Sequence, residues 1–324
     1  MLKKGAVAVA TLALLAGTAH AQDKRVTVYT AVKASVADAL APRFEKETGI
    51  KVDLVKAGSG DILKRVKAEA GAPKADVIWS IGGEQLEDSK DLLQAFTPAA
   101  DADIIPAYKV SPEWVPYNGI VAVFSVNSAE LKPEGYPKSW KDLADPKWKG
   151  KISSARADTS GSAYQQLATI ITIYGETEGW DIAKKILGNT VLSDSSGAVP
   201  RFVNDGEALV GLTLEDGALD YVRGGGNVAI VYPEDGTSTV ADGMALVKGA
   251  PQAENGKKFI DWLLTKEIQE YLVKEVGRRS VRKDVGGAGM TPITRIKLAK
   301  YDIKAAAASR NAYIAKWKEL QAAR

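Results

Sequence analysis

The sequence predicts an α/β fold with a mostly parallel sheet, because segments typical of strands alternate with segments typical of helices. Residues 24–32 (KRVTVYTAV) have the alternating, β-branched pattern of a strand, and residues 35–49 place apolar side chains at helical spacing up to Gly49. The chain contains no cysteine, so packing of its core must hold the folded state. A mature chain of about 300 residues is more typical of two domains than of one.

The same alternation continues along the chain. Residues 50–58 predict a second strand, residues 61–70 a helix that begins after a glycine-serine turn, and residues 75–80 a third strand. Apolar runs bounded by glycine, proline or asparagine give the remaining elements. These are strands at 119–127, 208–214, 227–233 and 241–249, a short helix and turn within 137–152, helices on either side of Gly175, and a mainly helical tail from residue 253.

The first 21 residues have the layout of a bacterial secretory signal peptide. Lys3 and Lys4 precede an apolar run, and Ala19 and Ala21 give the small-x-small pattern of a cleavage site. The apolar run is too short to span a membrane as a helix. We therefore expect cleavage after Ala21 and a periplasmic mature protein.

The charge balance and the missing residue types exclude several classes of function. Loss of the signal peptide lowers Lys+Arg from 43 to 41 against 40 Asp+Glu, a net charge of about +1, which does not favour a nucleic-acid partner. His20 is the single histidine of the chain and leaves with the signal peptide. Histidine-dependent triads and most zinc sites are therefore excluded, whereas a carboxylate or tyrosine site for a hard metal remains open.

Three turns share one design, in which a strand is followed by a Gly/Ser/Thr turn and then a helix. They are Gly58-Ser59-Gly60, Thr159-Ser160-Gly161-Ser162 and Ser195-Ser196-Gly197. Unpaired N–H groups and the positive dipole end of a helix suit an anionic oxygen, and hydroxyls add donors. The alternative is that these residues simply cap their helices. None of the turns is a P-loop, because the Gly-Lys-Ser/Thr element is missing.

The chain resembles a known family along almost its whole mature length. The stretches VTVYTAV (26–32), SWKDLADPKWKGKI (139–152) and GRRSVRKDV (277–285) resemble periplasmic substrate-binding proteins of ABC importers. The relevant branch contains ferric-ion-binding proteins and binders of hexose phosphates and 2-aminoethylphosphonate. The resemblance implies a two-lobed type II binding protein, expected to be a monomer, that closes on its solute and docks on an ABC permease.

The resemblance also implies the lobe boundaries. Lobe 1 is expected to comprise residues 22–118 and 237–324, and lobe 2 residues 119–236. The hinge strands would cross between the lobes near residues 117–121 and 232–242.

The resemblance implies an anion site more strongly than an iron site. Iron binders have a Tyr-Tyr pair where this chain has Glu215-Asp216-Gly217, and many have a histidine near the position of Lys33. Their anion-binding Thr-Ser-Gly turn is matched at Thr159 to Ser162. Asp216 and Glu234 would read the organic end of the solute, whereas Glu215 is expected to be solvated. The predicted ligand-binding residues are Thr30, Ser59, Ser80, Thr159, Ser160, Gly161, Ser162, Ser196, Asp216 and Glu234.

Three functions remain open from the sequence. The first is capture of a small phosphorylated or phosphonate solute, with no cofactor, metal or catalytic residue. The second is a metal or metal-chelate binder of the same family that uses carboxylates. The third is a periplasmic hydrolase that uses Glu215, Asp216 and Glu234 as acid and base.

Overall fold

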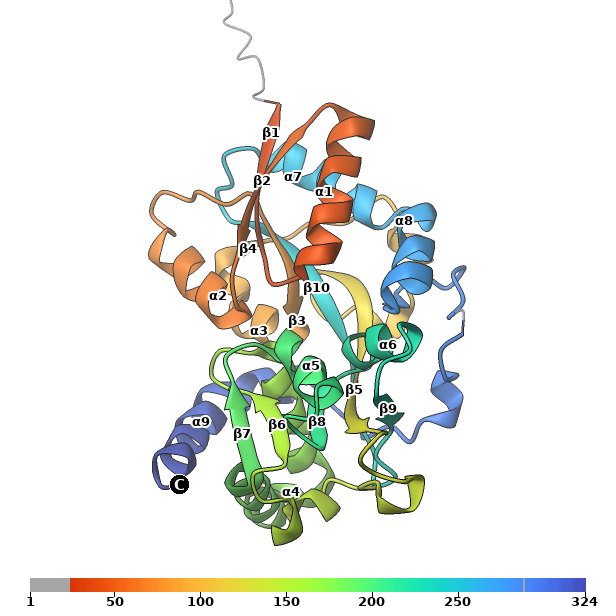
Figure 1. Cartoon of the computed structure of the whole chain (residues 1–324). Coiled ribbons are helices and arrows are strands. Elements are labelled where there is room, and N and C mark those ends of the chain that lie inside the picture. Colours follow the sequence, from red (N-terminus) through yellow and green to blue (C-terminus); the bar gives the residue numbers. More distant parts are fainter. Residues whose placement is uncertain (1–23, 288) are drawn as a thin grey trace, which may run out of the picture.

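The strands of the protein follow one path, β2-β1-β3-β10-β5-β8-β6-β7, in which the long strand β5 (Val115–Asn127) belongs to two halves (Figure 1). The first part of β5 pairs with β10 (Thr239–Val247), and the second part pairs with β8 (Val210–Leu214) and β9 (Val228–Val231). This computed structural model describes residues 24–287 and 289–324. The predicted signal peptide, residues 1–21, lies outside the described residues.

Lobe 1 is built on the first half of this path. β1 (Arg25–Thr30) lies between β2 (Lys51–Lys56) and β3 (Val77–Gly82) and is parallel to both, and β10 lies antiparallel between β3 and β5. Two short strands, β4 (Leu93–Gln94) and β11 (Arg279–Ser280), pair with β10 and β5. The helices are α1 (Ala34–Thr48), α2 (Ser59–Ala68), α3 (Gly83–Asp88), α7 (Ala253–Leu263) and α8 (Lys266–Tyr271), which continues into a π-helical turn, Leu272–Val276.

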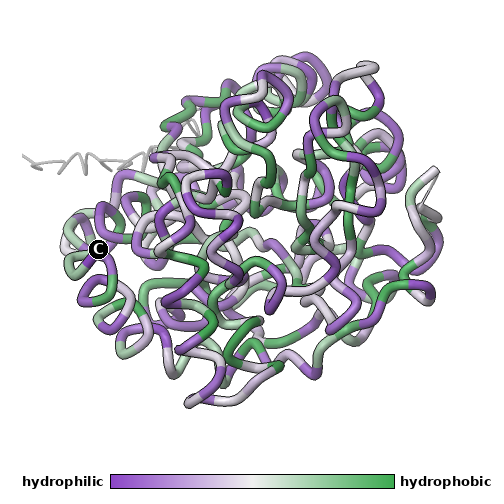
Figure 2. Tube along the Cα trace, turned by 60° about the horizontal axis from the view of Figure 1, so that its bottom comes forward, coloured by the Kyte–Doolittle hydropathy of each residue, from purple (hydrophilic) through white to green (hydrophobic). Residues whose placement is uncertain are grey.

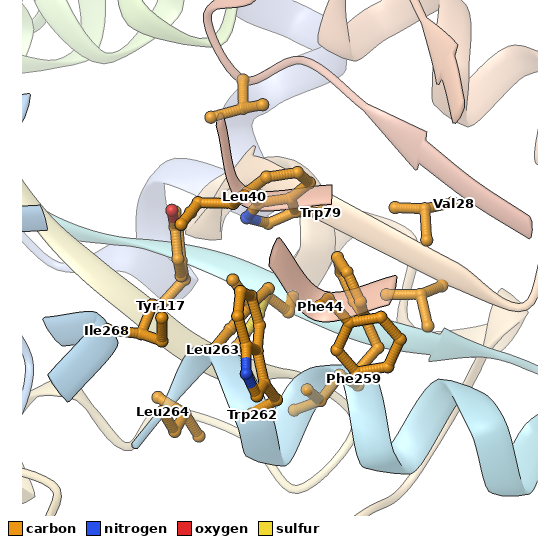
Figure 3. Packing of buried hydrophobic residues seen from close by; sticks show 14 of the residues in the cluster. Val28, Leu40, Phe44, Trp79, Tyr117, Phe259, Trp262, Leu263, Leu264 and Ile268 are labelled. Atoms are coloured by element: carbon orange, nitrogen blue, oxygen red, sulfur yellow. The ribbon is translucent and has the colours of Figure 1, made fainter. Parts of the chain in front are cut away.

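Aromatic side chains form the centre of the lobe 1 core (Figure 3). Phe44 of α1 packs edge-on against Phe259 of α7, with ring centroids 5.1 Å apart, and Trp79 of β3 lies 5.5 Å from the same ring. The helical spacing of apolar residues in α1 puts Leu40 and Phe44 on its buried face. This core fixes the start of α1 relative to the end of β1.

Lobe 2 is built on the second half of the path. β6 (Ile152–Ala155) is parallel to β7 (Thr190–Ser193) and to β8. The helices are α4 (Gly161–Asn189), α5 (Val199–Asn204) and α6 (Glu215–Arg223). α4 is broken at Gly175, where φ is 76°, so the expected helices on either side of this glycine are present.

The expected short helix within 137–152 is absent from the described fold. The segment instead forms two 3-10 turns, because Pro146 interrupts any longer helix. The 3-10 turns of the protein are Lys90–Leu92, Asp101–Asp103, Pro106–Tyr108, Pro133–Gly135, Asp142–Ala144, Pro146–Trp148, Ser196–Ala198 and Ile293–Arg295.

The C-terminal segment, residues 293–324, packs on both lobes, whereas the prediction assigned all of residues 237–324 to lobe 1. Ile296 lies in an apolar cluster with Val123 and Val203, and Trp317 of α9 (Ile303–Ala322) is buried in the lobe 2 core. α9 also touches α3 of lobe 1, where Tyr301 donates a hydrogen bond to Glu84 at 2.6 Å (Figure 1). The chain therefore passes between the lobes three times, through β5, the β9–β10 link and the segment after β11.

Hydropathy along the chain follows this packing. In Figure 2 the peripheral helices alternate hydrophilic and hydrophobic residues, as helices with one buried face do. Among the described residues, we find no helix with the length and apolar character needed to cross a bilayer.

Candidate functional site

A cleft of about 670 Å³ lies between the two lobes. Lobe 1 contributes the loops after β1 and β2 and the end of β3, and lobe 2 contributes the loops after β6, β7 and β8. Ile120 of β5, Asp242 of β10 and Arg278 complete the lining. Because β1 and β2 are parallel, as are β6, β7 and β8, the carboxyl ends of both strand sets face the same cleft.

Four helices begin at the cleft, namely α1, α2, α4 and α6. The turn Ser195–Gly197 also lies at the cleft. The N–H groups in the first turn of each helix have no partner within the helix, and the helix dipole is positive there. Ser160 caps α4, since its Oγ accepts the N–H of Ala163 at 3.3 Å, and Ser195 caps its own turn by accepting Gly197 N–H at 3.2 Å. The cap positions of α2, α4 and the Ser195 turn are Gly58, Ser160 and Ser195, so Ser59, Ser162 and Ser196 stand one or two residues past the cap.

Most of the predicted ligand-binding residues come together in this cleft. Those that line it are Ser59, Ser80, Thr159, Ser160, Gly161, Ser162, Ser196 and Asp216. They come from strand ends and helix starts. The first and last of them, Ser59 and Asp216, are 157 residues apart in the sequence. Their role in binding stays a prediction.

Two predicted ligand-binding residues lie outside the cleft lining. Thr30 is fully buried, and its hydroxyl donates to the carbonyl of Trp79 at 2.9 Å while accepting the N–H of Val32 at 3.0 Å. That hydroxyl therefore ties β1 to β3 within lobe 1. Glu234 is exposed in a turn of lobe 2, where its N–H donates to the carbonyl of Lys138 at 2.7 Å.

Arg278 organises the charged floor of the cleft. Its Nε donates to Asp216 Oδ2 at 2.7 Å, and its Nη1 donates to Asp242 Oδ2 at 3.0 Å and to Asn118 Oδ1 at 2.9 Å. Ser80, which also donates to Asp242, has a φ of 63° and is the one non-glycine residue with positive φ in the described part of the chain. Non-glycine residues rarely adopt this conformation, so Ser80 marks a strained backbone position at the edge of the cleft.

Lys33 reaches across from lobe 1 to α6 of lobe 2. Its Nζ lies 3.1 Å from Asp216 Oδ2 and 2.7 Å from Asp220 Oδ2, and it donates to the carbonyl of Asp216 at 3.2 Å. Burial alone would raise the pKa of Asp216, but Arg278 and Lys33 outweigh it and lower that pKa to about 2. Asp216 is thus bound by two protein cations, whereas the sequence predicted a carboxylate free to contact a solute.

Glu215, the neighbour of Asp216, is buried, and the prediction that it is solvated is wrong. Arg279 binds it through two parallel hydrogen bonds of 2.7 Å, and Tyr232 donates to it at 2.5 Å. Burial and the carboxylate of Glu215 raise the pKa of Tyr232 to about 12. These contacts join the start of α6 to β11 and hold it against lobe 1.

The other flank of the cleft is closed by backbone contact. Gly60 N–H donates to the carbonyl of Thr159 at 3.3 Å, which links the start of α2 to the loop before α4. A Cβ on Gly161 would lie 2.7 Å from Oε1 of Gln85 in lobe 1, and one on Gly58 would lie 3.3 Å from the carbonyl of Thr159. A side chain at Gly161 would therefore displace Gln85, and one at Gly58 would press on the backbone of the other lobe.

The comparison with known families agrees with this geometry. The family described as bacterial extracellular solute-binding protein matches residues 25–275. The chain belongs to this family. Membership of this family implies a periplasmic location and an ABC permease as partner. The predicted family and the predicted two-lobed α/β fold are confirmed.

Individual relatives of this solute-binding protein have different ligands in their names. A putative 2-aminoethylphosphonate-binding periplasmic protein of Salmonella paratyphi A is 32% identical over 75% of this chain and 73% of its own. Iron uptake protein A1 of Synechocystis is 26% identical over 78% and 74%. The structure of the periplasmic binding protein AfuA from Actinobacillus pleuropneumoniae, with exogenous fructose-6-phosphate bound, matches with a TM-score of 0.86 and 28% identity over 91% of this chain and 98% of that one.

Aspartates are the acidic residues of the cleft lining in this solute-binding protein, namely Asp61, Asp194, Asp216 and Asp242. No tyrosine, glutamate or histidine is found among the described residues that line the cleft. Across residues 24–287 and 289–324, no group of three or more His, Cys, Asp or Glu side chains is arranged to hold a metal ion. The two carboxylates on the cleft floor, Asp216 and Asp242, both face Arg278 instead.

Three cations of the cleft lining, Lys33, Lys56 and Arg278, are outside the predicted set of ligand-binding residues, although the sequence allows Arg278 either an anion-binding or an interlobe role. Lys33 lies in the turn between β1 and α1, and Lys56 is the last residue of β2, so the strand–turn–helix pattern that identified Ser59 was a usable signal for both. Arg278 lies between a π-helical turn and a two-residue strand, and no comparable local pattern marks it.

Proposed function

We propose that this protein captures a small phosphorylated or phosphonate solute, such as 2-aminoethylphosphonate or a sugar phosphate, by closing its lobes on the solute without chemical reaction. One observation carries the proposal. Four helix starts and a serine turn, which supply N–H groups and hydroxyls, converge on one cleft from both lobes. A solute that bridges them stabilises the closed arrangement relative to the open one.

The strength of such contacts is sufficient for capture. A micromolar dissociation constant corresponds to about 8 kcal/mol. Hydrogen bonds to a charged group contribute roughly 1.5–3 kcal/mol each. Several contacts from Ser59, Ser162 and Ser196 and their neighbouring N–H groups supply this, after the cost of ordering is subtracted.

The charge balance of the cleft favours an organic solute over inorganic phosphate. Its cations are already engaged, since Lys33 and Arg278 bind Asp216 and Lys56 binds Asp38. Asp61 and Asp194 also line the cleft and are exposed. These carboxylates suit hydroxyl or ammonium groups at the far end of a solute whose anionic end lies at the helix starts. The names of the Salmonella relative and of the AfuA structure include such solutes.

The two other functions have less support. Iron uptake appears in the name of the Synechocystis relative, but tyrosine is missing from the described cleft lining. For a hydrolase, Glu215 and Asp216 are engaged by Arg279 and Arg278, and Glu234 lies outside the cleft. A carboxylate held by a guanidinium is a poor general acid, so we propose a binding protein and not an enzyme.

Calorimetric titration tests the proposal with 2-aminoethylphosphonate, fructose 6-phosphate, inorganic phosphate and ferric phosphate. We expect one of the two organic solutes to bind the wild-type protein. Ser162→Ala combined with Ser196→Ala should then weaken its binding roughly tenfold or more, since two hydrogen bonds to a charged group are lost. Ser128→Ala is the control, because Ser128 is an exposed serine of lobe 2 outside the cleft lining. Binding of ferric phosphate alone would contradict the proposal.

A further inference from the structure

Lys33 occupies a position where a lysine is locally unfavourable. It is the N-cap residue of α1, and it makes no side-chain capping bond. Ser, Thr, Asp and Asn are the preferred residues there, and a cation at a helix start is repelled by the positive end of the dipole. A residue that breaks a local rule of this kind is expected to be compensated elsewhere in the structure.

The compensation lies entirely in the other lobe. The ammonium of Lys33 has three N–H donors, and three acceptors on α6 surround it: Asp220 Oδ2 at 2.7 Å, Asp216 Oδ2 at 3.1 Å and Asp216 O at 3.2 Å. Lys33 follows β1 in lobe 1, whereas α6 follows β8 in lobe 2. Its three donors are therefore satisfied by acceptors of the other lobe.

The two acceptor carboxylates depend on Lys33 to different degrees. Asp216 is buried and has a second cation, Arg278, at 2.7 Å. Asp220 is half exposed, and within the described chain Lys33 is the one cation at ion-pair distance from it. Removing Lys33 would leave Asp220 unpaired and Asp216 half neutralised, both beside the cleft.

We propose that Lys33 is a specificity-determining clamp, which ties α1 to α6 in the absence of solute and masks an acidic patch, Asp216 and Asp220, from the cleft. While Lys33 is in place, an ammonium group on a solute finds these carboxylates occupied. Without it, a solute ammonium takes the place of the lysine. The masking part of this inference rests on the proposed function, whereas the clamping part concerns the protein alone.

Two variants test the clamp without any solute. Lys33→Met removes the ammonium and keeps the length of the side chain. Lys109→Met is the matched control, because Lys109 forms an exposed 2.8 Å ion pair with Asp101 inside lobe 1 and does not line the cleft. In small-angle X-ray scattering of the solute-free proteins, we expect a larger radius of gyration for Lys33→Met than for the wild type and Lys109→Met. Equal radii for the three proteins would overturn the clamp.

Matched pairs of solutes test the masking. The pairs are 2-aminoethylphosphonate with ethylphosphonate, and glucosamine 6-phosphate with glucose 6-phosphate, which differ mainly in the ammonium group. In Lys33→Met we expect the preference for the amino solute to rise roughly tenfold, the size of a typical coupling between two sites. Lys109→Met should leave that ratio at its wild-type value. An unchanged or lower ratio in Lys33→Met would overturn the masking.

The failure of the proposed function has a different signature. A wild-type protein that binds neither 2-aminoethylphosphonate nor fructose 6-phosphate would contradict the proposed function, while the scattering comparison would still decide the clamp. Asp220→Asn provides a second route to the same contact from lobe 2. It removes the negative charge 2.7 Å from Lys33 Nζ, and we expect it to increase the radius in the same direction as Lys33→Met. A radius equal to the wild-type value in both variants would contradict the clamp from both sides.

Discussion

Asp216 of lobe 2 forms ion pairs with two cations of lobe 1, Lys33 and Arg278. Its carboxylate is almost fully buried between Arg278 and Lys33. Such a buried pair is weak evidence for net stability, because desolvation offsets the attraction, but removing one partner leaves the other charges uncompensated. The negative charge of Asp216 therefore lies between two cations at the lobe boundary. Without it, the positive charges of Arg278 and Lys33 would repel each other.

The first prediction concerns acid stability. The pKa of Asp216 falls from 3.8 to about 2 on folding, so ionised Asp216 stabilises the native state above the unfolded value. One pKa unit corresponds to about 1.4 kcal/mol, so the shift represents about 2 kcal/mol. Asp216→Asn should lower the free energy of unfolding by at least about that much at neutral pH.

The difference between the two proteins should shrink as the pH falls from about 4 through about 2, because Asp216 becomes protonated in the folded state. Urea unfolding measured as a function of pH checks this. Two stability curves that stay parallel across that pH range would show that Asp216 is not the titrating group.

The start of α4 shows what an element contributes to the site. Strand β6 ends in a loop whose Ser160 caps the helix, and Gly161 then lies against Gln85 and Ser59 of lobe 1. The helix thus presents N–H groups to the cleft and also forms part of the lobe–lobe contact. Local sequence sets the cap, but the close approach depends on the absence of a side chain at one position.

Two glycines of α4 give a matched pair of variants. Gly161→Ala places a Cβ 2.7 Å from Gln85 Oε1, so we expect it to displace Gln85 from the lobe–lobe contact and weaken solute binding. Gly188→Ala has nothing within 4 Å of the new Cβ and should stabilise the helix by about 0.5–1 kcal/mol. Calorimetry with the bound solute, combined with thermal unfolding, separates the two effects. Equal affinities in Gly161→Ala and Gly188→Ala would show that this contact does not limit closure.

At the scale of the whole molecule, α9 joins the C-terminus to both lobes. Its Trp317 is buried in the lobe 2 core, and Tyr313 packs edge-on against Trp180 with ring centroids 5.4 Å apart. At the other end of this segment, Tyr301 bonds to Glu84 of α3. Lobe 2 is therefore completed by residues that follow the last strand of lobe 1.

Truncation of Trp317 tests this role. Trp317→Ala should lower the free energy of unfolding by about 3–5 kcal/mol, because a large buried side chain leaves a cavity. Lys318→Ala, next to it and exposed, should change it by no more than about 0.5 kcal/mol. Urea unfolding followed by circular dichroism measures both. A small effect of Trp317→Ala would mean that α9 is not part of the lobe 2 core.

Local patterns predicted much of the fold and part of the site. Strand ends followed by Gly-Ser turns identified Ser59, Ser162 and Ser196, because a helix start is encoded by adjacent residues. The pairing of Lys33 with Asp216 spans 183 residues and has no local signal. Thr30 was misplaced because alternation along a strand cannot tell whether its last hydroxyl faces the cleft or the neighbouring strand.

The three passages of the chain between the lobes have a consequence for how the protein acquires its structure during synthesis. Lobe 1 lacks β10, the strand between β3 and β5, until residue 247 has been made. Lobe 2 begins at β5 but lacks Trp317 until the last few residues appear. Neither half can finish burying its apolar surface while the polypeptide is growing, so folding of both must wait for an almost complete chain.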